Sequence, residues 1–111
     1  MKIKEVEVNG RTWNKADIKD LLQKNDKAVI RGLIVIYNYQ TADEKATAET
    51  SHDNGMGFNG IDAEILTSFV NFYSRNGYLS QKQLGIARKK MLKYSQQLLN
   101  HMYNEKMKGE Q

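Results

Sequence analysis

One stretch of the sequence restricts the fold more than any other, because apolar side chains recur in it every three or four residues. These side chains are Leu84, Ala87, Met91, Tyr94, Leu98 and Met102. This spacing places them along one side of an α-helix, and that side must be covered by other parts of the chain. Ser80 and Gln83 have the order of a capping box, in which each side chain binds the other residue's backbone N–H. The sequence therefore predicts a long helix that begins after Ser80 and ends at about Lys106.

Three more helices are predicted ahead of this one. Their expected ranges are Ala16 to Lys24, Lys27 to about Ala48, and Ala63 to Asn76. Asn14, Asp26 and Asp62 stand before them, and side chains of this kind accept N–H groups at helix starts. Gly77 follows the third helix, where a left-handed cap belongs. The β-branched residues within 29–36 would also suit a strand, but the length of the segment and its polar, alanine-containing continuation favour a helix.

The N-terminal residues favour a β-hairpin. Lys2 to Val8 is rich in β-branched residues, and Asn9-Gly10 is a strong signal for a two-residue turn, since both residues tolerate positive φ. Arg11 to Trp13 would be the short return strand. A lone hairpin is marginally stable in water, so we expect Trp13 to pack against the helices.

The predicted fold class is mainly α, of the α+β kind, with about four helices and a short N-terminal β-hairpin. A chain of 111 residues has room for one compact domain and hardly for two. We therefore expect residues 1–111 to form a single domain. Within it, residues 1–13 would form the hairpin, residues 14–107 the helical body and residues 108–111 a frayed tail.

Several kinds of chemistry are excluded or disfavoured by the residue content. Cysteine is absent, which excludes a disulfide scaffold, a thiol nucleophile and every zinc site with sulfur ligands. His52 and Asp53 could join Asp62 or Glu64 at a metal ion, but their spacing matches no known ligand set, and a surface histidine is favoured. No serine has the surroundings of a hydrolase nucleophile. We expect no enzyme, no cofactor and no metal.

The string from Gly55 to Gly60 fits the letters G-x-G-x-x-G. A dinucleotide site needs that string directly after a strand and at the start of a helix, within a βαβ unit. Here the preceding residues are polar loop formers and the neighbouring segments look helical. The favoured interpretation is an ordered glycine loop that Phe58 anchors in the core.

Positive charge is concentrated in the last third of the chain. Residues 78–111 hold seven basic and two acidic side chains, a net charge of +5, whereas the whole chain carries +4. Clustered cations release counterions from phosphates, and tyrosines among them can stack on unpaired bases. The candidate residues for binding nucleic acid or a partner are Lys82, Arg88, Lys89, Lys90, Lys93, Gln97 and Tyr78. Asn54 and Asn59 are further polar candidates nearby. A solvated helix face and a helix that docks on a protein remain open alternatives.

Several strings together resemble a pattern of small bacteriophage proteins that have no assigned activity. They are Gly57–Ala63 (GFNGIDA), Leu79–Gln83 (LSQKQ), Ala87–Met91 (ARKKM), Lys93-Tyr94, Gln97-Leu98 and the upstream Gln40–Glu44 (QTADE). The pattern is also similar to a segment attached to some phage helicase-like and replication-associated proteins. The resemblance covers roughly residues 15–100 and contains no catalytic signature. It implies a phage or prophage origin and an association with DNA transactions.

Two functions follow as expectations from this charge and this resemblance. The first is a phage-encoded, non-enzymatic accessory module for replication or recombination, whose basic C-terminal helix binds single- or double-stranded DNA. The alternative is a counter-defence protein, such as an anti-CRISPR, that binds and inhibits a host protein. That host protein could itself process nucleic acid, in which case the basic surface would not separate the two functions.

Location and self-association are predicted from the apolar residues. The start of the sequence, MKIKEVEV, lacks the apolar core of a signal peptide, and the apolar stretch Leu33 to Tyr37 is too short to span a membrane. We therefore expect the host cytoplasm as the location and no membrane partner. Exposed Tyr39, Phe72 or Met102 could form the seam of a homodimer.

Overall fold

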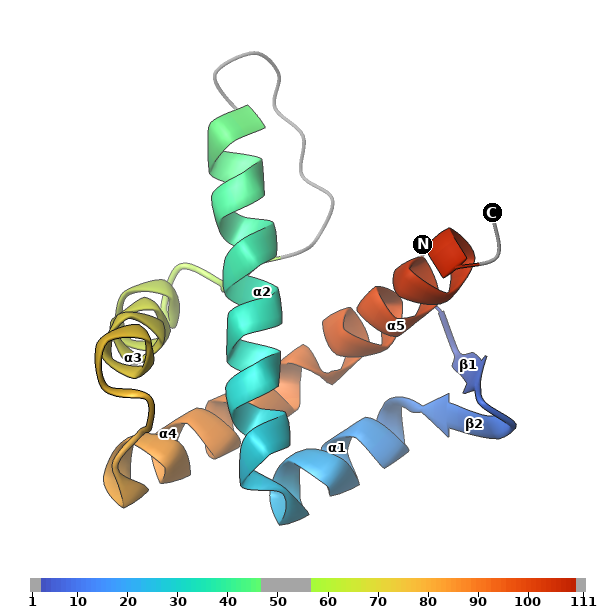
Figure 1. Cartoon of the computed structure of the whole chain (residues 1–111), viewed down its shortest axis with the longest axis horizontal. Helices are drawn as coiled ribbons and strands as arrows, with labels where there is room; N and C mark the ends of the chain where they lie inside the picture. Colours follow the sequence, from blue (N-terminus) through green and yellow to red (C-terminus); the bar gives the residue numbers. More distant parts are fainter. Residues whose placement is uncertain (1–2, 47–56, 110–111) are drawn as a thin grey trace.

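The computed structural model describes residues 3–46 and 57–109, which form a β-hairpin followed by helices (Figure 1). In chain order the elements are β1 (Glu5–Val8), β2 (Arg11–Asn14), α1 (Lys15–Lys24), α2 (Asp26–Ala46), α3 (Ala63–Asn76), α4 (Gln81–Met91), the 3-10 turn η1 (Leu92–Tyr94) and α5 (Ser95–Gly109). The prediction of a mainly helical α+β fold with an N-terminal hairpin is confirmed. In the described residues no helix is both long and apolar enough to cross a membrane.

The hairpin forms where the Asn9-Gly10 turn predicts it. Asn9 has a φ of 53° and Gly10 a φ of 80°, the positive values that a tight turn between antiparallel strands requires. β1 and β2 pair with Val6 opposite Trp13. Val6 is buried, and the hairpin packs on α1 and α5, so the helices supply the apolar cover that two strands lack.

Helix α2 is the centre of the helical body and contacts each of the other four α-helices (Figure 1). The fully buried core side chains include Leu22, Val29, Leu33, Ile36, Leu66, Met91 and Leu99. Gly32 allows the close approach of α2 to the C-terminal helices. A Cβ at this position would lie 3.0 Å from Met91 Cε and 3.2 Å from Leu98 Cδ1.

The long C-terminal helix begins as predicted. Ser80 Oγ accepts the Gln83 N–H at 3.1 Å, and Gln83 Oε1 accepts the Ser80 N–H at 2.9 Å. The helix is not uniform, however, because η1 separates α4 from α5, and α5 continues to Gly109 rather than ending at about Lys106. Leu99 becomes fully buried while Leu98 is only half-buried, since α5 packs on α1 and β1 as well as on α2.

The helix starts are correct to within one residue, but the predicted cap of α2 is wrong. Asn14 forms the cap of α1 as expected. At α2 the cap is Asn25, whose side-chain oxygen accepts the Ala28 N–H at 3.1 Å, and not Asp26. Helix α2 begins one residue earlier than predicted, so Asp26 lies inside its first turn and is free to pair with Arg88. The last two residues of the predicted range, 47 and 48, lie outside the described part of the chain.

Candidate functional site

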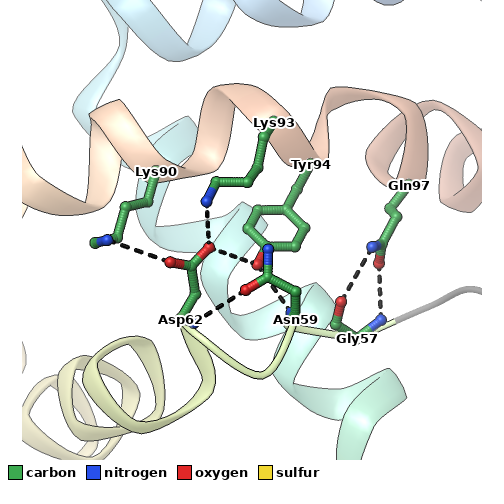
Figure 2. Close-up of polar contacts among 7 residues, drawn as sticks. All are labelled: Gly57, Asn59, Asp62, Lys90, Lys93, Tyr94 and Gln97. Carbon is green, nitrogen blue, oxygen red and sulfur yellow. Dashed lines mark hydrogen bonds and ion pairs between the residues drawn. The ribbon is translucent and has the colours of Figure 1, made fainter.

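The Gly57–Asp62 loop leads into α3 and is held by side chains from α4, η1 and α5 (Figure 2), and by one side chain from α2. Gln97 binds both backbone polar groups of Gly57: its Oε1 accepts the Gly57 N–H at 2.7 Å and its Nε2 donates to the Gly57 carbonyl at 3.0 Å. Gln40 accepts the Phe58 N–H at 3.2 Å. The Phe58 ring is buried edge-on against Tyr94, with ring centroids 5.7 Å apart, so the prediction that Phe58 anchors this loop is confirmed.

Asp62, at the end of this loop, has a completely buried carboxylate with three donors around it (Figure 2). Its Oδ1 lies 3.2 Å from Lys90 Nζ, and its Oδ2 lies 2.7 Å from Lys93 Nζ and 2.8 Å from the Tyr94 hydroxyl. The prediction that this side chain caps α3 is wrong, because it makes no cap hydrogen bond. A buried charge needs paired charge and hydrogen bonds, and α4 and η1 supply both.

The electrostatics of this cluster favour an ionised Asp62 and a neutral Tyr94. Burial acts to raise the pKa of Asp62, but the hydrogen bonds from Lys93, Tyr94 and Lys90 together outweigh it and hold the pKa below its ordinary value. Burial, supported by the neighbouring Asp62 charge, raises the pKa of Tyr94 to about 12. The Tyr94 hydroxyl thus keeps its proton, donates a hydrogen bond to Asp62 and accepts one from the Asn59 N–H at 3.0 Å.

The structure divides the seven residues predicted as binding candidates. Arg88 Nε donates to the Leu22 carbonyl at 2.9 Å, and its guanidinium also pairs with Asp26, so this side chain joins α4 to the junction of α1 and α2. Lys90 and Lys93 bind Asp62, and Gln97 binds Gly57. These four side chains therefore hold the fold together. Lys93 remains 49% exposed, and it can still meet a partner.

The other two lysines lie on the solvent side of α4. Lys82 and Lys89 are exposed and form no ion pair with any described side chain. Lys82, Gly85 and Lys89 are separated by three or four residues in turn, which places them along one side of α4, opposite the buried Ala87 and Met91. We call these three residues the outer stripe.

Tyr78 lies just ahead of α4 and is 57% exposed. Its ring meets Phe72 of α3 edge-on, with centroids 5.7 Å apart, so an aromatic neighbour supports it while much of the ring faces solvent. Tyr39, by contrast, is half-buried and its hydroxyl binds His101 Nδ1 at 2.9 Å, which makes the prediction of an exposed Tyr39 wrong. Burial lowers the pKa of His101 and favours the neutral ring that this bond allows.

The remaining candidates are either internal or outside the described residues. Asn59 accepts the Asp62 N–H through its side chain at 3.0 Å, so it serves the start of α3. His52, Asp53 and Asn54 lie outside the described residues, as does the beginning of the glycine string. Within residues 3–46 and 57–109, no group of three or more histidine, aspartate or glutamate side chains is placed to hold a metal ion.

Comparisons with known protein families, with curated proteins and with solved structures find no match to this chain.

Proposed function

We propose that this protein is a non-enzymatic accessory module that binds the phosphate backbone of nucleic acid through the outer stripe of α4. The observation that carries the proposal is the position of Lys82 and Lys89. Both extend into solvent on the side opposite the core, and no anionic side chain of the described residues neutralises them. Cations without internal partners gain most from a polyanion, because they release its condensed counterions.

The spacing along the stripe suits a linear row of phosphates. An α-helix rises about 1.5 Å per residue, so the backbone positions of Lys82 and Lys89 are about 10 Å apart. Long, flexible lysine side chains can adjust over such a distance to follow one strand. The stripe thus supplies positioning contacts that carry no sequence information by themselves.

Two residues of the stripe, Gly85 and Lys82, reduce the stability of α4. Gly85 lies inside the helix, where glycine is about 0.5–1 kcal/mol less favourable than alanine. The fold does not require it, since a Cβ at Gly85 would meet nothing within 4 Å. Lys82 lies in the first turn, which holds no acidic residue, so its charge opposes the helix dipole. A bound phosphate backbone would offset both costs, because it can approach closely at Gly85 and neutralise Lys82.

Tyr78 extends the proposal toward single-stranded nucleic acid. An exposed aromatic ring just ahead of the helix that carries the lysines can stack on an unpaired base, which a duplex does not offer. The resemblance to segments of phage replication-associated proteins supports a role beside a phage helicase or recombination protein in the host cytoplasm.

The proposal is tested by fluorescence anisotropy of labelled single- and double-stranded DNA at low and at physiological salt. The double variant Lys82→Glu/Lys89→Glu should weaken binding about tenfold or more, for every sequence tested. The matched control is Lys15→Glu/Lys19→Glu, which changes the net charge equally at exposed positions of α1. Equal losses in the two double variants would show that net charge alone matters, and no binding at low salt would overturn the proposal.

A second candidate function is the binding and inhibition of a host protein, as in an anti-CRISPR. The observation that favours it is an open apolar groove between α1, α2 and α5. Co-purification of a single host protein, together with weak binding to DNA at low salt, would support this function over the first.

A further inference from the structure

The groove between α1, α2 and α5 has a volume of about 670 Å³. The apolar side chains that line it and remain half-buried are Leu21, Ala28, Ile34, Val35, Leu98 and Met102. Ile18 and Leu22 are buried at its base. Each of the three helices contributes residues three or four positions apart, so the groove follows the helix surfaces and is open on its solvent side.

The charge along the groove has one sign. Lys27 and Arg31 of α2 are the charged residues that line it, both are exposed, and neither forms an ion pair with a described side chain. No aspartate or glutamate is among the lining residues. His101, at the α5 side, is bound to Tyr39, and its lowered pKa favours the neutral form. An occupant with carboxylates therefore meets complementary charge and no opposing acid in the lining.

The length of the groove suits a helix better than a lipid chain. Its α2 wall runs from Lys27 to Val35, eight residue steps or about 12 Å, which accommodates about two turns of a docked helix. A lipid chain gains most from an enclosed cavity, whereas here six apolar side chains stay half-exposed to solvent. An amphipathic helix covers such a surface with its apolar side and keeps its polar side in water.

We propose that this groove docks an amphipathic helix of a protein partner, with carboxylates along the edge of its apolar side that faces Lys27 and Arg31. The inference deepens the protein-binding candidate function and rests on it. It is independent of DNA binding, because the groove contains no residue of the outer stripe.

The test uses two labelled amphipathic peptides of about 18 residues, with leucines at helical spacing. One carries glutamates along an edge of its apolar side and the other carries lysines at the same positions. Anisotropy should show the glutamate peptide binding about tenfold or more tightly than the lysine peptide, with the difference reduced at high salt. Binding of neither peptide at concentrations up to about 1 mM, or equal binding of both, would overturn the proposal.

Variants locate the binding. Arg31→Glu changes an exposed side chain and should weaken the glutamate peptide about tenfold while leaving the fold intact by circular dichroism. Val35→Glu places a charge on the half-buried wall and should abolish binding. Lys82→Glu, on the outer stripe, is the matched control and should leave peptide binding unchanged but weaken DNA binding. Loss in the Lys82 variant equal to that in the Arg31 variant would overturn the assignment to the groove.

Other occupants have their own signatures. Sedimentation that shows a dimer at micromolar concentration, lost in Val35→Glu, would assign the groove to a second copy of the chain and overturn the proposal. Tight binding of dodecanoate without binding of the glutamate peptide would assign it to a lipid. A host protein that co-purifies equally with the wild type and Arg31→Glu would leave the protein-binding function standing and overturn the inference about the groove.

Discussion

The cations of the α4–η1 segment lie on two sides that differ in what surrounds them. On the inner side, Lys90 and Lys93 hold the buried carboxylate of Asp62, and Arg88 pairs with Asp26. On the outer side, Lys82 and Lys89 have no anionic partner among the described side chains. In the sequence, the cations of both sides belong to one basic cluster, within residues 82–93.

This difference shows that the charge of a segment overstates the charge that it offers to a partner. Residues 78–111 carry a net charge of +5, but three of their cations stabilise the loop before α3 and the junction of α1 and α2. The inner side should therefore govern stability and the outer side should govern binding. The predictions below test that division.

Replacing Asp62 with alanine should cause the largest loss of stability, about 3 kcal/mol. The Tyr94 hydroxyl would lose its buried acceptor, and Lys90 and Lys93 would lose their anion. The partial exposure of both lysines keeps the loss below that of a fully buried pair. The loss in unfolding free energy is measured by urea unfolding, with circular dichroism as the probe. Asp26→Ala is the control, and its loss should be much smaller because the Asp26 carboxylate is 65% exposed. Equal losses in the two variants would contradict the division between the inner and outer sides.

The interactions of the Asp62 carboxylate should make the free energy of unfolding depend on pH in the acid range. The pKa of Asp62 in the folded chain lies below its ordinary value of 3.8, so folding favours the ionised form. Its stabilising effect is complete above the unfolded value and disappears as the pH falls below about 3.8 and through the folded pKa. The difference in unfolding free energy between the wild type and Asp62→Asn should therefore shrink in that range. A difference that stays constant down to about pH 2 would show that Asp62 is not stabilised as an anion.

Gln97→Leu should cost about 1–2 kcal/mol, because it removes both hydrogen bonds to the Gly57 backbone while keeping a similar volume. Hydrogen exchange of the Gly57 amide should become faster in this variant. Gln23→Leu, at an exposed position of α1, is the matched control and should leave that exchange rate unchanged. If Gly57 exchanges at the same rate in all three proteins, Gln97 does not hold the loop.

Gly85→Ala should have a smaller effect, and it should act in opposite directions on stability and on DNA binding. Alanine favours the helix and has open space here, so the free energy of unfolding should rise by about 0.5–1 kcal/mol. DNA binding should weaken, since a methyl group would stand between Lys82 and Lys89 where a phosphate backbone approaches. Anisotropy and urea unfolding measure the two effects, with Gln81→Ala as the control in the first turn of α4. Unchanged DNA affinity in a stabilised Gly85→Ala would remove Gly85 from the interface.

Local signals predicted most of the fold. Asn9-Gly10 sets the hairpin, Ser80 and Gln83 set the start of α4, and Gly77, with a φ of 79°, ends α3 as expected. Each of these signals acts within a few residues, so the local sequence is enough to predict the turn, the helix start and the helix end. The same local logic misassigned Asp62, which stands where a cap belongs.

The polar contacts around the loop could not be predicted, because their partners are far apart in the chain. Lys90 meets Asp62 across 28 residues, and Gln97 meets Gly57 across 40. No periodicity links such positions, and only the packing of α4 and α5 on the loop brings them together. The outer stripe could be predicted from the sequence, since helical offsets alone separate Lys82 and Lys89 from the buried side of the helix.

The most direct test of the account is the salt dependence of binding to single-stranded DNA, for the wild type and for Lys82→Gln/Lys89→Gln. The logarithm of the association constant falls linearly with the logarithm of the salt concentration, with a slope of about 0.7 for each phosphate contact on a single strand. If the outer stripe binds the backbone, the slope should be shallower by about 1.4 in the double variant, for two lost contacts. An unchanged slope would mean that Lys82 and Lys89 touch no phosphate, and would contradict the assignment of nucleic-acid binding to the outer side of α4.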